Sequence, residues 1–557
     1  MELGYSVHER SFESMEAPVN DRAPTRSSAR GEELYAAPAR TVVLGAGTMG
    51  RGIAQLLAQA GSRVALCDAD AATLESARRA LKGVFTMLAD KGRLEAPPDA
   101  VFARLSFVGE PPADDGVTWV FEAIYEDLEA KRSLFEHAAR AYPHASLATN
   151  TSTLSVTAIA AGCSRPERVV GMHFFNPAPL MPLVEVVPGV RTDPEVVEAA
   201  LTVARVLGRT PVVAQDRPGF IVNRVARPFY GEALRLAGEG VPVEAIDRTA
   251  RGAGFPMGPF ELLDLIGIDV NLSATRSVYQ AFFQEPRYRP HPLQAAMVEA
   301  GRLGRKSGRG FYRYGAEGGS PPAAGAAPGA PGAPRRRKDA PRVAVLGQGA
   351  VARALRERLP VAEQPAEAAL VLDARVDLAD KALPDELADL PVATLCWAHS
   401  ASRALERCGR PLVGFSLVPP LGEAPVVELM APEGADAATL DPARKVLEAS
   451  GLDTLTLPDR AGGVVFRLVA LLANEAVSAV AEGLADATAI DAAMRLGTRY
   501  PRGPLAWACE LGLADLRAGL RGLHEEIGAE RFAPQPLLTR LAAVRAERFP
   551  DGAEAGT

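Results

Sequence analysis

A chain of 557 residues is too long for one hydrophobic core, and at about 100–200 residues per domain it predicts three to five domains. Hydrophobic residues make up 48% and charged residues 23%, as is ordinary for a globular protein. The net charge of −7 argues against a general binder of nucleic-acid backbones, and no apolar run reaches the about 18 residues of a membrane span. We therefore expect neither a nucleic acid nor a membrane as a partner.

The N-terminal segment and the cysteines add two further exclusions. Residues 1–38 are polar and lack the apolar stretch of a secretory signal, so they predict a disordered extension and a cytoplasmic protein. The five cysteines are odd in number and form no CxxC pair, which argues against a disulfide framework and against zinc. No metal site is expected.

The first elements after this extension predict a strand, a glycine-rich turn, a helix and a second strand. Residues 40–44 are apolar, and Gly45-Ala-Gly-Thr-Met-Gly50 follows at once. Residues 53–60 continue as a helix, and residues 62–68 form a second apolar run that ends in Asp68. This order is typical of a dinucleotide site.

Each part of this motif has a physical task at a bound dinucleotide. Gly45 permits the tight turn, Gly47 lets the backbone approach the pyrophosphate, and Gly50 lets helix and strand pack closely. The helix N-terminus offers free N–H groups to the phosphates, and the Asp68 carboxylate suits the ribose hydroxyls and repels a 2′-phosphate, which favours NAD over NADP. The alternative, a turn in an unrelated fold, does not explain the two strands and the acid. The residues predicted to contact NAD here are Gly45, Ala46, Gly47, Thr48, Met49, Gly50 and Asp68.

Further along, a histidine and a glutamate lie on two apolar runs that a proline-rich connection joins. Residues 169–175 contain His173, and residues 183–187 contain Glu185. If these runs pair as strands, the two side chains could face each other. The imidazole could then take the proton of a substrate hydroxyl while hydride leaves the carbon for nicotinamide, and the carboxylate would fix the tautomer and stabilise the imidazolium.

Ser152 and Asn223 complete the candidate catalytic set, because a hydroxyl and an amide can hold the substrate oxygen as its charge changes. Taken singly, each residue has an ordinary alternative. Ser152 could cap a helix over 153–161, and Asn223 could be a surface helix residue. His173 could be a satisfied core residue, and Glu185 could be a structural ion-pair partner. The spacing of the whole set favours catalysis.

Six stretches between residues 40 and 315 together match one known family, in that family's order. They are Gly45-Ala-Gly-Thr-Met-Gly50, Asn150-Thr-Ser152, His173-Phe-Phe-Asn-Pro177, Pro218-Gly-Phe-Ile-Val-Asn-Arg224, Pro256-Met-Gly-Pro-Phe-Glu-Leu262 and Gly308-Arg-Gly-Phe-Tyr312. This segment resembles the 3-hydroxyacyl-CoA dehydrogenase family. The resemblance implies that His173 is the general base, paired with Glu185, and that Ser152 and Asn223 contact the substrate hydroxyl or carbonyl.

The resemblance also implies contacts outside the glycine turn, with NAD and an acyl-CoA as the expected partners. Further NAD contacts would come from Glu126, Lys131, Asn150 and Lys306. Substrate contacts would come from Ser152, Asn176 and, near the CoA phosphates, Lys91. The long form of this chain resembles bacterial enzymes that act on short-chain or dicarboxylic acyl-CoA, such as 3-hydroxybutyryl-CoA and the 3-hydroxyadipyl-CoA of phenylacetate breakdown.

After a Gly-, Pro- and Ala-rich linker at residues 316–340, the chain repeats itself. The stretch from Pro411 resembles the stretch from Arg168, 243 positions earlier. The chain is therefore a duplicated two-domain unit. The second copy is shorter, since Gly45 to Ser152 covers 107 positions whereas Gly347 to Ser400, the nearest counterpart, covers 53. About half of the second nucleotide-binding domain has been lost.

The second copy lacks groups that the chemistry needs. Its glycine turn has Ala352 in place of the third glycine, and no second strand with a terminal acid is evident. Ser416 stands where the first copy has its histidine and Phe466 where it has its asparagine, while Glu428 persists. We expect this half to bind no dinucleotide and to be inert.

A packing role remains for the second copy. Its stretch 464–485 is long and apolar, and in the family the helical domain mediates dimerisation. The second copy is therefore expected to serve as an intramolecular pseudo-dimer partner, with a homo-oligomer as the alternative.

The predicted fold is α/β: a Rossmann-like, parallel, doubly wound domain followed by an all-helical domain, with this unit duplicated and its second copy shortened. The predicted segments are a disordered extension at 1–38, an NAD-binding domain at 39–222, a helical domain at 223–315, a linker at 316–340, a degenerate Rossmann-like remnant at 341–458 and a second helical domain at 459–550.

The predicted reaction oxidises (S)-3-hydroxyacyl-CoA with NAD to 3-oxoacyl-CoA and NADH, in the cleft between the first two domains. One alternative is a related β-hydroxyacid dehydrogenase that acts on a free sugar acid, which a panel of CoA thioesters and free acids would separate. Another is a non-catalytic NAD-binding scaffold, against which the intact four-residue set argues. An NADH absorbance assay decides that case.

Overall fold

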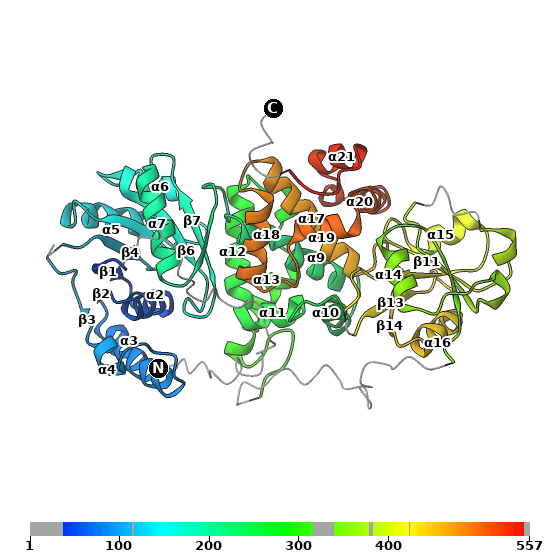
Figure 1. Ribbon diagram of the computed structural model, residues 1–557, viewed down its shortest axis with the longest axis horizontal. Helices are drawn as coiled ribbons and strands as arrows, with labels where there is room; N and C mark the ends of the chain where they lie inside the picture. The colour runs from blue at the N-terminus through cyan, green and yellow to red at the C-terminus, as the bar shows by residue number, and fades with distance from the viewer. Residues whose placement is uncertain (1–36, 114–115, 316–338, 378–382, 423, 551–557) are drawn as a thin grey trace, which may run out of the picture.

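The structure, a computed structural model, describes residues 37–113, 116–315, 339–377, 383–422 and 424–550. The predicted N-terminal extension and linker lie almost entirely outside these ranges. Figure 1 shows two α/β domains at opposite ends of the described chain, with the helices of both copies between them. The fold class predicted from the sequence is confirmed.

The first α/β domain is built on an eight-stranded sheet in the order β3-β2-β1-β4-β5-β6-β7-β8. Its strands are β1 (Arg40–Leu44), β2 (Arg63–Cys67), β3 (Leu105–Val108), β4 (Trp119–Glu122), β5 (Ser146–Thr149), β6 (Val169–Phe174), β7 (Leu183–Pro188) and β8 (Thr210–Val213). Its helices are α2 (Thr48–Gln59), α3 (Ala71–Asp90), α4 (Pro98–Phe102), α5 (Leu128–Ala141), α6 (Val156–Ala160) and α7 (Pro194–Val206).

Alternate residues of a strand in this sheet face different cores. Val42 of β1 joins the core that contains Phe135 of α5, whereas Val43 joins the core that contains Ile53 of α2. Helices therefore cover both faces of the sheet, which explains why the central strands are nearly continuous apolar runs.

Strand β7 is the exception in an otherwise parallel sheet. The other neighbouring strands pair in parallel, whereas β6 and β7 pair in antiparallel. Parallel neighbours need a long crossover, but only residues 175–182 join these two strands, and so short a connection reverses the chain. This reversed pair carries the candidate dyad.

Only helices follow β8 in the first copy. They are α8 (Val222–Val225), α9 (Arg227–Gly238), α10 (Val243–Gly252), α11 (Pro259–Ile266), α12 (Ile268–Ala281) and α13 (Pro292–Glu299). The second copy ends in the same way, with α17 (Val465–Ala481), α18 (Ala487–Thr498), α19 (Pro504–Leu511), α20 (Leu513–Ile527) and α21 (Pro536–Ala543). Among the described residues, no helix is both long and apolar enough to cross a membrane.

The second α/β domain repeats the first with two strands fewer. Its strands and helices are β9 (Val343–Leu346), α14 (Ala350–Arg358), β10 (Leu370–Asp373), β11 (Val392–Leu395), α15 (Ala401–Cys408), β12 (Val413–Ser416), β13 (Val426–Met430), α16 (Asp441–Ala449) and β14 (Asp453–Leu457). The sheet order β14-β13-β12-β11-β10-β9 matches β8 back to β4 and then β1, so β2 and β3 have no counterpart.

The helical domains of the two copies pack against each other with approximate two-fold symmetry. Helix α9 of the first copy lies against α17 of the second (Figure 1), and these helices lie at matching positions of the repeat. Two sets of ion pairs, each centred on a buried arginine, cross this contact, and each is the image of the other at the 243-residue offset. The sets are Arg224 with Glu475 and Glu482 (2.7 and 2.6 Å), and Arg467 with Glu232 and Glu239 (2.6 and 2.9 Å).

Candidate active site

The histidine and the glutamate of the candidate dyad lie opposite each other on β6 and β7. The antiparallel register pairs His173 with Glu185, and the distance from His173 Nδ1 to Glu185 Oε2 is 2.6 Å. The side chains are 7% and 0% exposed. A carboxylate can only accept, so Nδ1 carries the proton and Nε2 is left as the basic nitrogen.

The other oxygen of Glu185 is held by the chain that enters the helical domain. Glu185 Oε1 accepts hydrogen bonds from the backbone N–H groups of Ile221 and Val222, both at 3.0 Å. The preceding residues, Gly219 and Phe220, turn the chain with φ angles of 76° and 45°. A left-handed conformation at a phenylalanine costs roughly 1–2 kcal/mol. The turn delivers two N–H donors to a buried carboxylate, which fixes the anion that orients the imidazole.

Aromatic rings enclose the imidazole of His173. The Phe175 ring lies 4.4 Å and the Phe220 ring 5.9 Å from it, measured between centroids. Sequence reasoning missed these neighbours, although both belong to the matched motifs. They form apolar walls and limit the access of water to the base.

Ser152, on the sheet side, and Asn223, at the start of the helical part, come together in the structure. Asn223 Nδ2 donates to the Ser152 carbonyl at 3.3 Å. The alternative in which Ser152 caps a helix is wrong, because α6 begins after Ser155, whose side chain accepts from Ala158 N. Ser152 lies instead on the loop after β5, where its hydroxyl makes a long hydrogen bond of 3.4 Å to Glu126 Oε1.

Glu126 accepts hydrogen bonds from several polar groups of that loop. Its Oε1 accepts from Thr151 Oγ1 (2.7 Å) and from the N–H groups of Ser152 and Thr153 (both 2.9 Å). Burial would raise the pKa of Glu126, but the Lys131 charge and these hydrogen bonds hold it below its ordinary value. Glu126 is therefore an anion that positions the Ser152 loop.

Lys131 acts on the site through carboxylates. Its ammonium is 1% exposed and lies 2.5 Å from Glu122 Oε1 and 3.4 Å from Glu126 Oε2. Lys131 is thus held by two carboxylates on the side of the Ser152 loop, and its contact with NAD stays a prediction. Glu122, which the sequence analysis missed, also accepts from Thr149 Oγ1 at 2.6 Å.

The glycine turn has the geometry that a dinucleotide needs. Gly45 has a φ of 101°, and a Cβ on Gly50 would lie 1.8 Å from the Gly45 carbonyl oxygen. A Cβ on Gly47 would meet no atom within 4 Å, so the space where a pyrophosphate belongs is open. No side chain caps α2, which leaves its first N–H groups to a phosphate. Asp68, at the end of β2, accepts from Ala46 N at 2.8 Å and lies beside the turn. These residues fit NAD.

The remaining predicted contacts are spread over both domains of the first copy. Asn150 Oδ1 accepts from Phe174 N at 2.8 Å and so ties the end of β5 to β6. Asn176 is exposed in the β6–β7 connection, and Lys91 ends α3. Lys306 lies in the helical domain, where it pairs with Asp269 at 2.6 Å. These roles stay predictions.

The second copy keeps the scaffold of this site without its chemistry. Ser416 lies opposite Glu428, which accepts from Val464 N and Val465 N at 3.0 and 2.9 Å, as Glu185 does in the first copy. Burial raises the pKa of Glu428 to about 7. With no imidazole beside it, this carboxylate has no base to orient.

The counterpart of Ser152 in the second copy is Trp397, which corrects the sequence expectation of Ser400. Strand register places Thr394 where the first copy has Thr149, and Ser400 caps α15 as Ser155 caps α6. The Trp397 ring stacks on Phe466 with centroids 4.4 Å apart and planes at 12°. Two aromatic rings therefore fill the space of the serine and the asparagine.

The second glycine turn is closed by a side chain. A Cβ on Gly349, the counterpart of Gly47, would lie 2.3 Å from Asp515 Oδ2 of α20. A carboxylate thus occupies the helix N-terminus that would face a phosphate. The ribose-binding acid is missing as well, because β2 has no counterpart and the acid that ends β10, Asp373, is bound by Arg375 at 2.8 Å.

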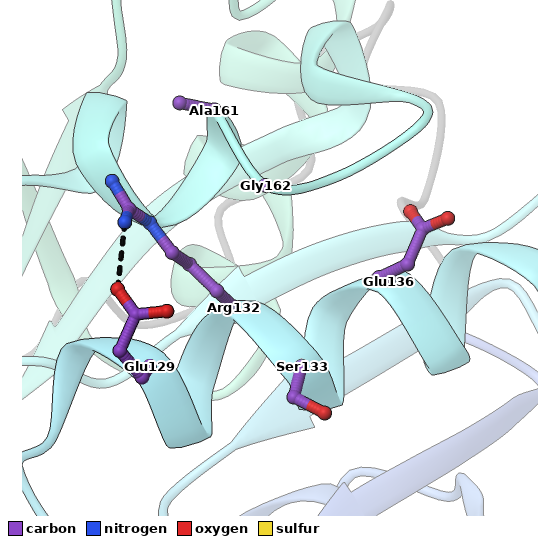
Figure 2. Close-up of a pocket in the computed structure, with 6 residues that line it drawn as sticks. All are labelled: Glu129, Arg132, Ser133, Glu136, Ala161 and Gly162. Atoms are coloured by element: carbon purple, nitrogen blue, oxygen red, sulfur yellow. Dashed lines mark hydrogen bonds and ion pairs between the residues drawn. The ribbon is translucent and has the colours of Figure 1, made fainter.

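A surface depression beside α5 is unrelated to this site. Figure 2 shows Arg132 in contact with Glu129 on α5, with Ala161 and Gly162 across the depression. Arg132 also donates to the Ala158 carbonyl, so its hydrogen bonds are used within the protein. Among the described residues, no cluster of three His, Cys, Asp or Glu side chains is placed to hold a metal ion.

Family profiles match the chain in both copies. The profile described as "3-hydroxyacyl-CoA dehydrogenase, NAD binding domain" covers residues 40–217. The profile "3-hydroxyacyl-CoA dehydrogenase, C-terminal domain" matches twice, at 219–314 and at 462–556, which agrees with the repeat.

Named relatives and solved structures point the same way. A 3-hydroxyadipyl-CoA dehydrogenase of Escherichia coli K12 is 39% identical over 507 residues, 90% of this chain and 96% of the relative. A 3-hydroxybutyryl-CoA dehydrogenase of Bradyrhizobium diazoefficiens is 42% identical over 278 residues, 49% of this chain and 94% of the relative. A crystal structure of an Escherichia coli 3-hydroxybutyryl-CoA dehydrogenase matches with a TM-score of 0.77 at 36% identity, covering 91% of this chain and 99% of its own. With the dyad and the open glycine turn in the first copy, these matches show that the chain belongs to the 3-hydroxyacyl-CoA dehydrogenase family.

Proposed function

We propose that the protein oxidises (S)-3-hydroxyacyl-CoA to 3-oxoacyl-CoA with NAD, and that the acyl group is short or dicarboxylic. The observation that carries the proposal is the hydrogen bond between His173 Nδ1 and Glu185 Oε2, which leaves Nε2 as a base. The names of the relatives, 3-hydroxyadipyl-CoA and 3-hydroxybutyryl-CoA dehydrogenase, support the substrate class.

Different residues of the first copy bind the cofactor and transfer the proton. Gly47 and the start of α2 would hold the cofactor phosphates, and Asp68 would bind its adenosine ribose. A bound NAD would supply the acceptor for the hydride that leaves the carbinol carbon. His173 Nε2 takes the hydroxyl proton, and the buried Glu185 carboxylate stabilises the imidazolium that forms.

Two further groups hold the substrate oxygen. The Ser152 hydroxyl and the Asn223 amide donate to it as the hydroxyl becomes a carbonyl. Glu126 keeps the Ser152 loop in place, and the bond from Asn223 to the Ser152 carbonyl joins the two walls of the site.

The test is a direct assay. NADH absorbance is followed with C4, C6-dicarboxyl and C16 3-hydroxyacyl-CoA, and with free 3-hydroxy acids as controls. We expect turnover with the first two thioesters and none with free acids. No turnover with any thioester, or preference for a free sugar acid, would overturn the proposal.

We also infer that the second copy acts as an intramolecular pseudo-dimer partner. The matching ion pairs of Arg224 and Arg467 and the contact between α9 and α17 support this role. A chain truncated near Gly315 should then dimerise or precipitate, because the apolar face of α9 loses its cover. A truncated chain that stays soluble, monomeric and fully active would refute the inference.

A further inference from the structure

One buried cation beside the candidate site has no carboxylate partner among the described residues. Arg227 begins α9, four positions after Asn223, and is 7% exposed. Its guanidinium donates to the Asn223 carbonyl (2.7 Å) and to Thr275 Oγ1 (3.0 Å), and it lies 5.2 Å from the centroid of the Tyr230 ring. Each of these partners is neutral, whereas the arginines that join the two copies each bind two carboxylates. An uncompensated buried charge is costly, which points to a ligand that completes it.

A buried phenol of the second copy faces the same region. Tyr500 is 5% exposed, and its hydroxyl has no hydrogen-bond partner among the described residues. Its ring packs 5.5 Å from that of Phe229, which is two positions beyond Arg227 on α9. Burial raises the pKa of the Tyr500 hydroxyl well above its ordinary value, and the nearby Arg227 charge acts in the opposite direction. A guanidinium and a phenolic donor are thus buried close together.

The segment that carries Tyr500 borders the candidate active site. It follows α18, and a Cβ on Gly497 of that helix would lie 3.0 Å from Val222 Cγ2 and 3.6 Å from Phe175 Cε1. The Phe175 ring is in turn 4.4 Å from the ring of His173. The two donors therefore lie on the helical side of the site.

We propose that Arg227 and Tyr500 bind a carboxylate at the far end of the acyl chain of a 3-hydroxyacyl-CoA. This inference rests on the proposed function and narrows its substrate class to dicarboxylic acyl thioesters. A carboxylate supplies the negative charge that Arg227 lacks and the acceptor that Tyr500 lacks.

The spacing between Asn223 of α8 and Arg227 of α9 suits a dicarboxylic chain. In a six-carbon chain, the terminal carboxyl carbon lies three bonds from the carbon that loses hydride. Arg227 lies one helical turn, about 5.4 Å, beyond Asn223, which is predicted to hold the oxygen of that carbon. The inert second copy would then contribute a residue, Tyr500, to the site of the first.

The experiment compares two substrates of equal length, 3-hydroxyadipyl-CoA and 3-hydroxyhexanoyl-CoA, which differ in the terminal carboxylate. In the full-length protein, Arg227→Met should lower kcat/KM for the dicarboxylic substrate about 10- to 100-fold more than for the hexanoyl substrate, mainly through KM. Tyr500→Phe should give a smaller selective loss of roughly 3- to 10-fold.

Binding without turnover provides a second readout. Adipyl-CoA and hexanoyl-CoA lack the hydroxyl, so they report affinity alone. Adipyl-CoA should raise the melting temperature of the wild type more than hexanoyl-CoA, and Arg227→Met should abolish this difference. Circular dichroism and NADH binding check that the variants fold. If Arg227→Met does not fold, Tyr500→Phe is used for the same comparison.

The outcomes separate this inference from the proposed function. Equal losses on both substrates would overturn the inference, since Arg227 would then only position Asn223. A wild type that oxidises the hexanoyl but not the adipyl thioester would also overturn it, while the proposed function stands. A wild type that oxidises no thioester would overturn both.

Discussion

The two α/β domains hold a buried glutamate in the same backbone cradle, but only the first places a base beside it. Glu185 and Glu428 lie at the same strand register and accept from equivalent pairs of N–H groups. Opposite them stand His173 and Ser416. The cradle is therefore a property of the fold, which packing preserves, whereas the chemistry depends on a few side chains that can change without loss of the scaffold.

The glycine turns of the two α/β domains also differ, since only the first leaves room for a ligand. Space above Gly47 is open, while Asp515 occupies the space above Gly349. The loss of two strands removed the ribose-binding acid and made β9 an edge strand. The second domain has thus exchanged a ligand-binding surface for internal contacts.

Removal of the imidazole should have the largest effect. His173→Ala should lower kcat by about 10²–10⁴-fold, because the hydroxyl proton loses its acceptor. NADH affinity, measured by fluorescence titration, should change little. The matched variant Ser416→Ala should keep wild-type turnover, and similar losses in both variants would contradict the difference between the copies.

The contact between the copies should be the next most sensitive feature. Arg467→Met leaves the fully buried Glu232 with Arg531 as its one remaining ion-pair partner among the described residues, and breaking such a pair costs about 3–5 kcal/mol. Urea unfolding measures the loss. The control is Arg502→Met, which breaks an exposed pair with Glu510 and should cost at most about 1 kcal/mol. A cost no greater than the control would mean that this ion pair does not stabilise the contact.

The two buried glutamates should respond differently to neutralisation. Glu428 has a folded pKa of about 7, raised by burial from 4.5, so its favourable contribution to stability is complete below pH 4.5 and is lost as pH rises through about 7. The glutamine side chain of the Glu428→Gln variant is uncharged at every pH in this range. The stability of this variant relative to wild type should therefore increase by up to about 3 kcal/mol between pH 4.5 and 7 and stay level above it.

Activity distinguishes the matched variant in the first copy. Glu185→Gln should lower kcat, since the imidazolium loses its anion, whereas Glu428→Gln should leave kcat unchanged.

For the stability prediction, the contradicting outcome is a difference between Glu428→Gln and wild type that stays constant from pH 4.5 to 7. It would show that Glu428 is ionised in the folded protein at all these pH values.

The glycine turns should give the smallest and most selective pair of effects. Gly47→Ala adds a Cβ that meets no protein atom within 4 Å, so stability should hold while NADH affinity falls about tenfold through interference with the pyrophosphate. Gly349→Ala would place a Cβ 2.3 Å from Asp515 Oδ2, so stability should fall while NADH affinity holds. The reverse pattern would place the cofactor in the second copy.

The local pattern of the first copy was readable from the sequence because each element there follows its own periodicity and turn chemistry. The glycine turn between two apolar runs predicted β1, α2 and β2, and the histidine and glutamate were assigned to strands that do pair. The direction of β7 was not readable, since a pattern of apolar residues carries no information on strand direction. The sequence also did not show how the shortened second copy aligns with the first in this loop. For this reason Ser400 was taken for the counterpart of Ser152, which is Trp397.

By itself, the sequence determined the repeat, the identity of the four candidate catalytic residues and the loss of the histidine from the second copy, because these depend only on which residue stands at which position. Only the tertiary structure decided how charges are shared: that Lys131 binds two carboxylates, that Arg224 and Arg467 pair across the copies, and that Arg227 and Tyr500 are buried without a carboxylate partner among the described residues. Partners of this kind come from segments hundreds of positions apart, and no local pattern in a single sequence records which of them meet.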